Sequence, residues 1–199
     1  MKQVFVTGTD TGVGKTLVSA WLTRGWQAEY WKPVQSGSLE ICDYDSVADL
    51  VPGAVIHPSA YVLREPLSPH QAARLDGVQI DLARIRLPKT TAPLIVEGAG
   101  GVMVPLNDRD LMIDLMAQLA LPVVLVARSG LGTLNHTLLS LDALRRRHIT
   151  VLGVVMNGPA NPDNRQAIEH YGQVRVLAEL PLLDAVTSST LATLPHPSF

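Results

Sequence analysis

A glycine-rich stretch close to the N-terminus constrains this chain more than any other feature. It reads GTDTGVGKT from Gly8 to Thr16 and comes just after an apolar run at residues 4–6. Glycines let backbone N–H groups surround phosphate oxygens, the N-terminus of a helix adds positive potential, and Lys15 adds a full charge. The stretch therefore predicts a strand, a turn that binds the phosphates of a nucleotide, and the start of a helix.

This turn is one residue longer than the common phosphate-binding loop. The common pattern places four residues between its first glycine and Gly-Lys-Thr, whereas five separate Gly8 from Gly14. A tight turn without a ligand would explain the glycines, but it would not explain a lysine and a threonine in order behind them. In the nucleotide-binding interpretation, Lys15 reaches the β and γ phosphates and the hydroxyl of Thr16 binds Mg²⁺.

The composition fits a globular protein that needs no covalent cross-link to be stable. A chain of 199 residues, 47% of them hydrophobic, is long enough for one core. Its net charge of −2 argues against a general nucleic-acid binder. The lone Cys42 rules out an internal disulfide and suits a reducing compartment. No signal peptide and no apolar run of about 18 residues stands out, so we expect a cytoplasmic protein without a membrane or nucleic-acid partner.

Strand and helix patterns alternate along the chain. Apolar runs predict strands at 4–6, 28–31, 94–96, 122–126, 151–156 and 174–177, and helical spacing predicts helices at 16–24, 45–50, 111–119, 134–147 and 162–171. Parallel neighbours need crossover connections, so this alternation predicts an α/β fold with a mostly parallel sheet and helices on both faces, like that of P-loop NTPases. We expect a single domain over residues 1–199, with a tail that frays from about residue 190.

Some predicted helix ends rest on single residues. Gly25 is expected to end the first helix, and Asp110 and Thr133 are expected to cap the helices that follow them. From residue 52 the chain shows little periodicity until residues 70–75, and a short helix is expected over residues 80–87.

Polar residues that follow the strands are the candidates for a functional site. Ligands bind at the carboxyl edge of a parallel sheet, and Lys32 and Ser36 come just past a strand. Glu97 follows an apolar run as a Walker B carboxylate does when it holds Mg²⁺, although a glycine turn with an incidental glutamate would look the same. Asn157 also follows a strand, and it can either read a purine edge or tie down its turn.

Two other places allow more than one interpretation. Asp43 and Asp45 lie near the start of a short helix, and the residues alone favour a capping role over a ligand role. The loop at residues 127–133 leads into a helix that Thr133 would cap. Its free N–H groups fit either a second anion site or the start of an ordinary capped helix.

Four segments in this order resemble the dethiobiotin synthetase family of biotin biosynthesis. They are GTDTGVGKT at 8–16, KPVQSG at 32–37, VEGAGG at 96–101 and GLGTLNH at 130–136, and the match runs from residue 2 to about residue 183. The resemblance implies an ATP-dependent cyclo-ligase that turns 7,8-diaminopelargonic acid, CO2 and ATP into dethiobiotin, ADP and phosphate. A substrate amine takes up CO2 as a carbamate, ATP phosphorylates the carbamate, and the neighbouring amine closes the ring on this carbamic-phosphoric anhydride.

The resemblance also implies roles for individual residues. The catalytic residues would be Thr11, Lys15 and Lys32. The Mg²⁺ ligands would be Thr16, Asp45 and Glu97, which replaces the capping interpretation of Asp45. ATP, the co-substrate, would contact Gly12, Val13, Gly14, Lys15, Thr16, Asn157, Pro181 and Leu182. The diamino acid would contact Ser36, and a second subunit would supply Leu131, Gly132 and Asn135, so a homodimer is implied.

Some features depart from the family, and a rival class of protein shares the loop. Gly12 stands where some members carry a glutamate, and residues 52–89 match only around Ser68-Pro69-His70. The alternative is a P-loop ATPase switch of the partition or assembly type. Such switches generally carry an extra lysine early in the loop, where this chain has Asp10. An amide-forming relative would need a glutamine-hydrolysing domain, for which 199 residues leave no room.

Overall fold

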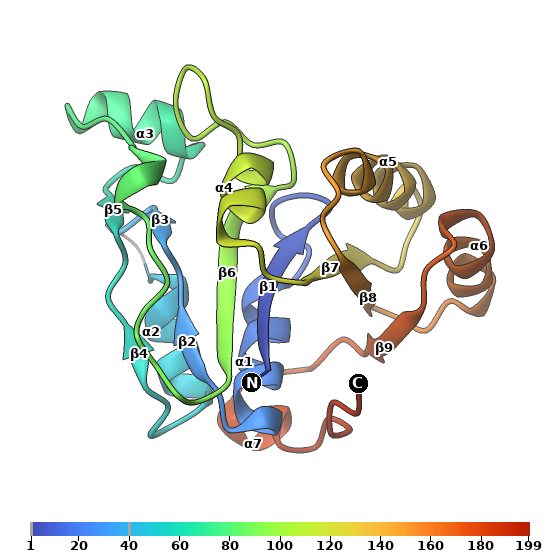
Figure 1. Ribbon diagram of the computed structural model, residues 1–199. Helices are drawn as coiled ribbons and strands as arrows, with labels where there is room; N and C mark the ends of the chain where they lie inside the picture. The colour runs from blue at the N-terminus through green and yellow to red at the C-terminus, as the bar shows by residue number, and fades with distance from the viewer. Residues whose placement is uncertain (1, 40) are drawn as a thin grey trace.

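A parallel sheet forms the centre of the computed structural model, which describes residues 2–39 and 41–199. Its seven strands lie in the order β4-β2-β6-β1-β7-β8-β9, and every neighbouring pair is parallel (Figure 1). The strands are β1 (Gln3–Gly8), β2 (Glu29–Trp31), β4 (Ile56–His57), β6 (Leu94–Gly101), β7 (Val123–Arg128), β8 (Val151–Asn157) and β9 (Val176–Leu180). The predicted α/β fold is confirmed.

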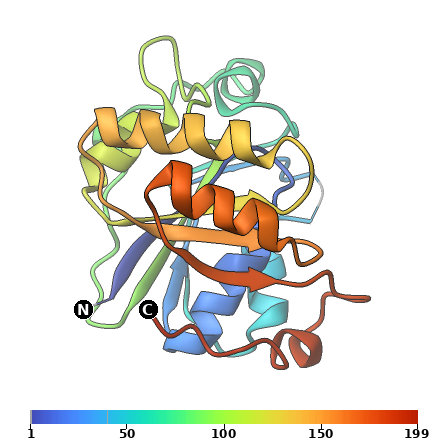
Figure 2. The ribbon, with the colours of Figure 1, turned by 90° about the vertical axis from the view of Figure 1, so that its right-hand side faces the viewer.

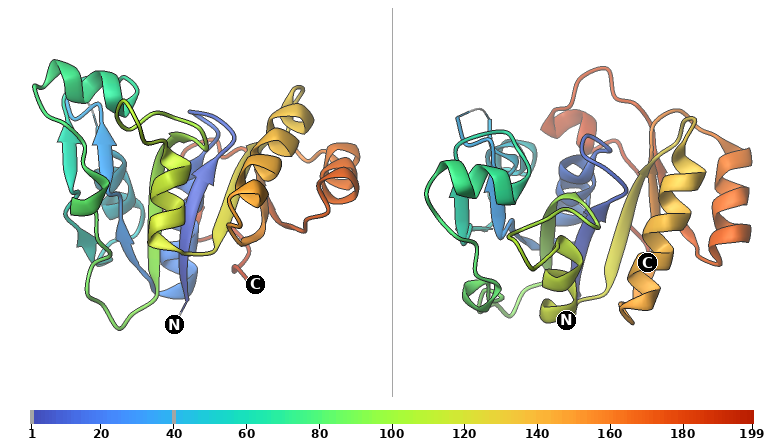
Figure 3. Two further views of the ribbon diagram at one scale, coloured as in Figure 1. Left: turned by 45° about the horizontal axis from the view of Figure 1, so that its top comes forward. Right: turned by 90° about the horizontal axis from the view of Figure 1, so that it is seen from above.

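Helices cover both faces of this sheet, and Figure 3 shows α4 and α5 on one side with α1 on the other. The helices are α1 (Lys15–Trp26), α2 (Asp43–Leu50), α3 (Pro69–Leu75), α4 (Met112–Leu119), α5 (Thr133–Arg146), α6 (Pro162–Gly172) and α7 (Ser188–Leu191). One buried cluster joins the sheet to α3, α4, α5 and α6, and a second joins the other face to α1, α2 and α7. Since both faces are covered, the strands read as continuous apolar runs. Among the described residues, no helix combines the length and apolarity that a membrane crossing requires.

The position of β1 brings the glycine-rich loop to the carboxyl edge of the sheet. β1 lies between β6 and β7, where Val6 pairs with Glu97 on one side and with Val124 on the other. The loop that follows turns through left-handed backbone at Gly12, with a φ of 71°, and at Gly14, with a φ of 96°. Only glycine adopts such backbone without strain. The predicted strand, turn and helix start are therefore present.

Two helices begin differently from the predictions. Asp110 does not cap α4, because the N–H of Leu111 donates instead to the carboxylate of Asp114 at 2.8 Å. Thr133 is the first residue of α5, and Gly132 stands at the N-cap with a φ of 91°. A capping side chain and a first-turn side chain differ by one or two positions, which sequence spacing alone does not resolve.

The segment at 52–89 contains structure that its sequence did not predict. β3 (Val34–Ser36) and β5 (Tyr61–Leu63) form a second, two-stranded parallel sheet that no pattern indicated, whereas α3 covers the stretch at residues 70–75 where periodicity returns. The helix expected over residues 80–87 is only the 3₁₀ turn η1 (Leu82–Arg84), where Asp81 accepts a hydrogen bond from the N–H of Ala83. β4 and β5 have only two and three residues and depend on pairing with their neighbours, so local periodicity did not reveal them.

The C-terminal tail packs against α1, where the sequence predicted fraying. The indole N–H of Trp21 donates to the carbonyl of Pro195 at 2.6 Å, and that of Trp26 donates to Pro197 at 3.3 Å. Gly25 does not end α1, since the helix continues to Trp26. A Cβ on Gly25 would lie 2.3 Å from the ring of Pro197, so this glycine makes room for the tail. Figure 2 shows the tail returning past α1 so that the two termini lie close together.

Candidate active site

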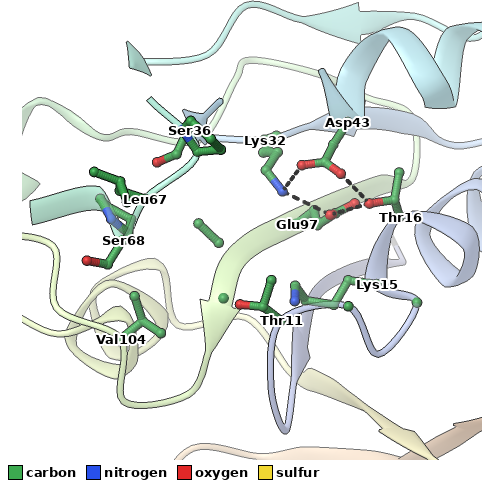
Figure 4. A pocket seen from close by; sticks show the side chains of 16 residues that line it. Thr11, Lys15, Thr16, Lys32, Ser36, Asp43, Leu67, Ser68, Glu97 and Val104 are labelled. Carbon is green, nitrogen blue, oxygen red and sulfur yellow. Dashed lines mark hydrogen bonds and ion pairs between the residues drawn. The ribbon is translucent and has the colours of Figure 1, made fainter. Parts of the chain in front are cut away.

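A pocket of about 510 Å³ opens beside the glycine-rich loop at the carboxyl edge of the sheet. Figure 4 shows side chains that reach it from the loop, from the segment around β3, from α2 and from β6. The lining residues are Thr11, Gly12, Gly14, Lys15, Thr16, Lys32, Ser36, Asp43, Pro66, Leu67, Ser68, Pro69, Glu97, Ala99, Gly100 and Val104. The residues predicted to act on phosphate and carbamate therefore meet in one place.

Lys32 lies between two carboxylates in this pocket (Figure 4). Its Nζ is 2.7 Å from Oδ2 of Asp43 and 3.0 Å from Oε1 of Glu97. Only 4% of the Lys32 side chain is exposed. Burial would lower the pKa of Lys32, but the two carboxylates outweigh that effect and hold its pKa above the ordinary value. Lys32 is thus a fixed positive charge in the pocket.

Thr16 brings a hydroxyl to the same two carboxylates. Its Oγ1 lies 2.5 Å from Oδ1 of Asp43 and 3.0 Å from Oε1 of Glu97, and its one proton can serve only one of them at a time. Burial raises the pKa of Asp43, but Lys32 and Thr16 more than compensate and hold it below its usual range. One hydroxyl and two carboxylates are oxygen ligands of the kind that Mg²⁺ takes together with phosphate and water. Across the described ranges, no group of three His, Cys, Asp or Glu side chains is arranged to hold a metal ion.

The carboxylate that α2 contributes is Asp43 and not Asp45. α2 starts at Asp43, and residues two apart on a helix point to different sides. Asp45 is exposed to solvent, whereas Asp43 contacts both Lys32 and Thr16. The prediction of Asp45 as a metal ligand does not fit this geometry, and we replace it with Asp43. The sequence of the acidic stretch could not decide between the two aspartates. The residue at which α2 begins determines which side chain faces the pocket, and the sequence does not fix that residue.

Tyr30 contacts the site from below, which the sequence did not predict. Its hydroxyl donates to Oε2 of Glu97 at 3.0 Å, and both side chains are fully buried. Burial and the neighbouring Glu97 raise the pKa of Tyr30 well above its ordinary value, so the phenol keeps its proton. In the sequence, Tyr30 is one more apolar residue of a short strand.

The glycine-rich loop is held in shape by its own residues and by Arg128. Nζ of Lys15 donates to the carbonyl of Asp10 at 2.9 Å. Burial lowers the pKa of Lys15, and Lys32 lowers it further, against the raising effect of Glu97 and Asp43. The Asp10 carboxylate accepts from the N–H of Thr11 at 2.7 Å and pairs with Arg128 at 3.0 Å. The position that carries a lysine in switch ATPases is thus occupied here by the acidic half of an ion pair.

Asn157 lies against this loop rather than in the pocket lining. Its Nδ2 donates to the carbonyl of Val13 at 3.1 Å, and a Cβ on Gly14 would lie 2.1 Å from that nitrogen. Its Oδ1 is buried and has no hydrogen-bond partner in the part of the chain that the structure describes. Asn157 pairs with Leu180 across β8 and β9, so the predicted base contacts Pro181 and Leu182 follow directly beside it.

Ser36 lines the wall of the pocket that sequence patterns left largely unread. Its Oγ is buried, and none of the described residues hydrogen-bonds to it. Leu67, Ser68 and Val104 line the pocket with it (Figure 4). The sequence had already pointed to Ser36, and the block Ser68-Pro69-His70 is a signal that could have pointed to its neighbours on this wall.

The structure does not bring Leu131, Gly132 and Asn135 to the pocket of their own chain. Leu131 is 103% exposed, and Gly132 and Asn135 are exposed at the start of α5. Leu139, about one turn after Asn135 along α5, is 62% exposed. These residues form an outward surface whose N–H groups lie at a helix N-terminus, where anions are favoured.

Comparisons with known proteins show the family to which this chain belongs. A family model described as an AAA domain matches residues 2–190. The chain is 64% identical to the ATP-dependent dethiobiotin synthetase BioD of Paramagnetospirillum magneticum, over 100% of this chain and 97% of that protein. It is 59% identical to the biotin biosynthesis bifunctional protein BioCD of Bordetella avium, over 94% of this chain but 41% of that longer protein. A ParA family ATPase from Chlorobium tepidum shares the fold, with a TM-score of 0.62 at 13% identity over 97% of this chain and 90% of that one. The chain belongs to the ATP-dependent dethiobiotin synthetase family.

Proposed function

We propose that this chain joins CO2 to 7,8-diaminopelargonic acid and closes the cyclic urea of dethiobiotin, with ATP as co-substrate and Mg²⁺ as cofactor. The observation that carries the proposal is the buried ammonium group of Lys32, 3.0 Å from Glu97 and 2.7 Å from Asp43, in the pocket that also holds Lys15 and Ser36. Membership of the family supports it. The chemistry needs no covalent residue, only charge and position.

ATP would bind on the glycine-rich loop, where backbone N–H groups and the N-terminus of α1 favour phosphate. Lys15 would turn from the Asp10 carbonyl, 2.9 Å away, to the β and γ phosphates. Asn157 would face the adenine, since its buried Oδ1 has no partner among the described residues and can accept from the amino group of the base. Pro181 and Leu182 would cover the base, because they follow β9 beside Asn157.

Thr16, Asp43 and Glu97 would hold the magnesium ion, because the Thr16 hydroxyl already lies within 3.0 Å of both carboxylates. When bound, the ion would neutralise charge on the β and γ phosphates. Lys32 contacts the same two carboxylates, so its ammonium group would lie next to the transferred phosphoryl group.

Lys32 and Lys15 would also act on the substrate amine. An amine must be neutral to take up CO2, and two nearby ammonium groups disfavour its protonated form. The same positive charges stabilise the carbamate that results. The hydroxyls of Thr11 and Ser36, both in the pocket lining, can donate hydrogen bonds to this carbamate.

The pocket would hold the carbamate, the γ phosphate and the second amine in register for ring closure. Positioning of this kind can lower a barrier by about 7–11 kcal/mol. Leu67 and Val104 offer apolar contact for the hydrocarbon chain of the substrate.

The active protein would be a cytoplasmic homodimer in which each subunit completes the other's pocket. Leu131, Gly132 and Asn135 are exposed on α5 and outside their own pocket lining. The N-terminus of α5 favours a carboxylate, and the substrate carries one. Leu139, 62% exposed on the same helix, supplies apolar surface for contact between subunits.

The test is to follow phosphate release with ATP and Mg²⁺ while the diamine and bicarbonate are added separately and together. We expect release to require both. Release at the same rate without the diamine would contradict the proposal, and it would favour a nucleotide-driven switch.

A further inference from the structure

Glu97 has a hydrogen-bond partner on the side away from the pocket. The hydroxyl of Tyr30 donates to Oε2 at 3.0 Å, whereas Lys32 and Thr16 both contact Oε1 at 3.0 Å. Tyr30 and Glu97 are each 0% exposed. The two oxygens of one carboxylate therefore have separate tasks, and water competes for neither.

The register of the sheet explains why Tyr30 reaches this carboxylate. Tyr30 in β2 pairs with Ile95 in β6, and Ile95 and Glu97 lie two residues apart on one face of the sheet. Tyr30 and Ile95 both belong to the buried cluster beneath α1 and α2. The ring of Tyr30 thus fills the core under the site, and its hydroxyl reaches the carboxylate above.

A donor on Oε2 helps to fix the plane of the Glu97 carboxylate, whose other oxygen contacts Lys32 and Thr16. The last torsion of a glutamate is broad and roughly two-fold, so packing of the side chain does not fix the plane of the carboxylate. A fully buried carboxylate also needs hydrogen-bond donors from the protein for both of its oxygens. The phenol supplies one of these donors from the rigid side, and Oε1 remains directed toward the pocket.

We propose that Tyr30 is a positioning residue of the active site, whose hydroxyl holds Oε2 of Glu97 so that Oε1 faces Thr16 and Lys32. This inference deepens the proposed function, because it takes Glu97 as a ligand of Mg²⁺. Tyr30 touches neither substrate nor metal in this role and acts through Glu97.

The test compares Tyr30→Phe with Tyr61→Phe. The first substitution removes the hydroxyl and keeps the ring in the core. The control removes a hydroxyl that accepts from the N–H of Asp81 at 2.9 Å, outside the lining of this pocket. The probe is Mn²⁺ with ADP, and free Mn²⁺ is measured by electron paramagnetic resonance. We expect Tyr30→Phe to bind Mn²⁺ about 10- to 100-fold more weakly, as for other groups that orient a metal ligand, and Tyr61→Phe to bind it like the wild type.

Unchanged Mn²⁺ affinity in Tyr30→Phe would overturn the proposal. An equal loss in both variants would also overturn it, because general destabilisation would then explain the result.

A double-mutant cycle adds a readout that a purely structural role does not move. In a Glu97→Gln background, Tyr30→Phe should change Mn²⁺ affinity little, because its effect passes through Glu97. The same loss in both backgrounds would contradict the positioning role. Since Mn²⁺ binding needs no diamine, turnover that fails to depend on the diamine would count against the proposed function alone.

Discussion

At the scale of single residues, the proposed Mg²⁺ site depends on which aspartate of α2 reaches it. Asp43 contacts Thr16 at 2.5 Å and Lys32 at 2.7 Å, while Asp45 faces solvent. We predict that Asp43→Asn lowers diamine-dependent phosphate release about 10- to 100-fold and raises the Mg²⁺ concentration needed for half-maximal rate. Asp45→Asn, a matched change two residues away, should leave both unchanged. Equal effects of the two substitutions, measured side by side, would refute the assignment.

The lowered pKa of Asp43 also predicts a dependence of stability on pH. A carboxyl whose folded pKa lies below its unfolded value of about 3.9 contributes stability above that value, and this contribution is lost as pH falls through the folded pKa. The difference in unfolding free energy between the wild type and Asp43→Asn should therefore be largest near neutral pH and shrink below about pH 4. Urea titrations across this range would measure it. A difference that stays constant down to about pH 2 would show that the Asp43 charge has no stabilising partner.

The sequence predicts some residues of the pocket better than others, for physical reasons. Lys15 and Thr16 begin α1 directly after a loop whose backbone requires glycine, and Lys32 follows a strand whose end must lie at the ligand edge. The role of Asp43 was not predicted, because the sequence of a short helix does not reveal which of its sides faces the sheet. The contact of Tyr30 with Glu97 was not predicted, because a buried aromatic residue in a strand gives the same sequence pattern whether or not its hydroxyl contacts a site.

At the scale of elements, the glycine-rich loop is constrained differently at its two left-handed glycines. A Cβ added to Gly12, where φ is 71°, would meet open space, with no described atom within 4 Å of it. At Gly14 a Cβ would lie 2.1 Å from Nδ2 of Asn157. We predict that Gly12→Ala lowers the free energy of unfolding by about 1–2 kcal/mol, from backbone strain alone. Gly14→Ala should weaken ATP binding more than Gly12→Ala does, because Asn157 must leave the Val13 carbonyl. Calorimetric titration with ATP, alongside urea unfolding, would compare the two. Tighter binding by Gly14→Ala than by Gly12→Ala would contradict the packing of Asn157 against the loop.

Long elements were predicted from the sequence more completely than short ones, although the three-residue strand β2 was also predicted. The long buried strands β6, β7 and β8 and the helices α1, α5 and α6 follow from apolar runs and helical spacing. The three short strands β3, β4 and β5 do not, because pairing across the chain rather than local pattern defines them. The tail was also missed, since its order depends on the indole groups of Trp21 and Trp26, more than 170 positions away along the chain.

At the scale of the whole molecule, the proposed dimer predicts complementation between inactive chains. Lys32→Met removes the ammonium group from a chain's own pocket, and Asn135→Asp places a negative charge where the partner's substrate carboxylate would bind. Each variant alone should be nearly inactive. Co-expressed, half of the dimers should be mixed, with one intact site of two, so about a quarter of wild-type activity should return.

The control for complementation is a chain that carries both substitutions, Lys32→Met and Asn135→Asp. It should be inactive, because both sites of its dimer are then damaged. Lys89→Met, a change at an exposed lysine outside the pocket lining, should retain full activity and shows that loss of a lysine alone is harmless. Co-expression without recovered activity would contradict a site shared between subunits.

Isotope labelling can show whether this pocket carboxylates a diamine and closes a ring with ATP. The most direct measurement is mass spectrometry of the product formed from the diamine, ATP, Mg²⁺ and ¹³C-labelled bicarbonate, together with the phosphate released. The account predicts a cyclic urea that carries one ¹³C atom, one phosphate for each molecule of product, and neither in Lys32→Met. Phosphate release without a labelled cyclic urea would contradict it.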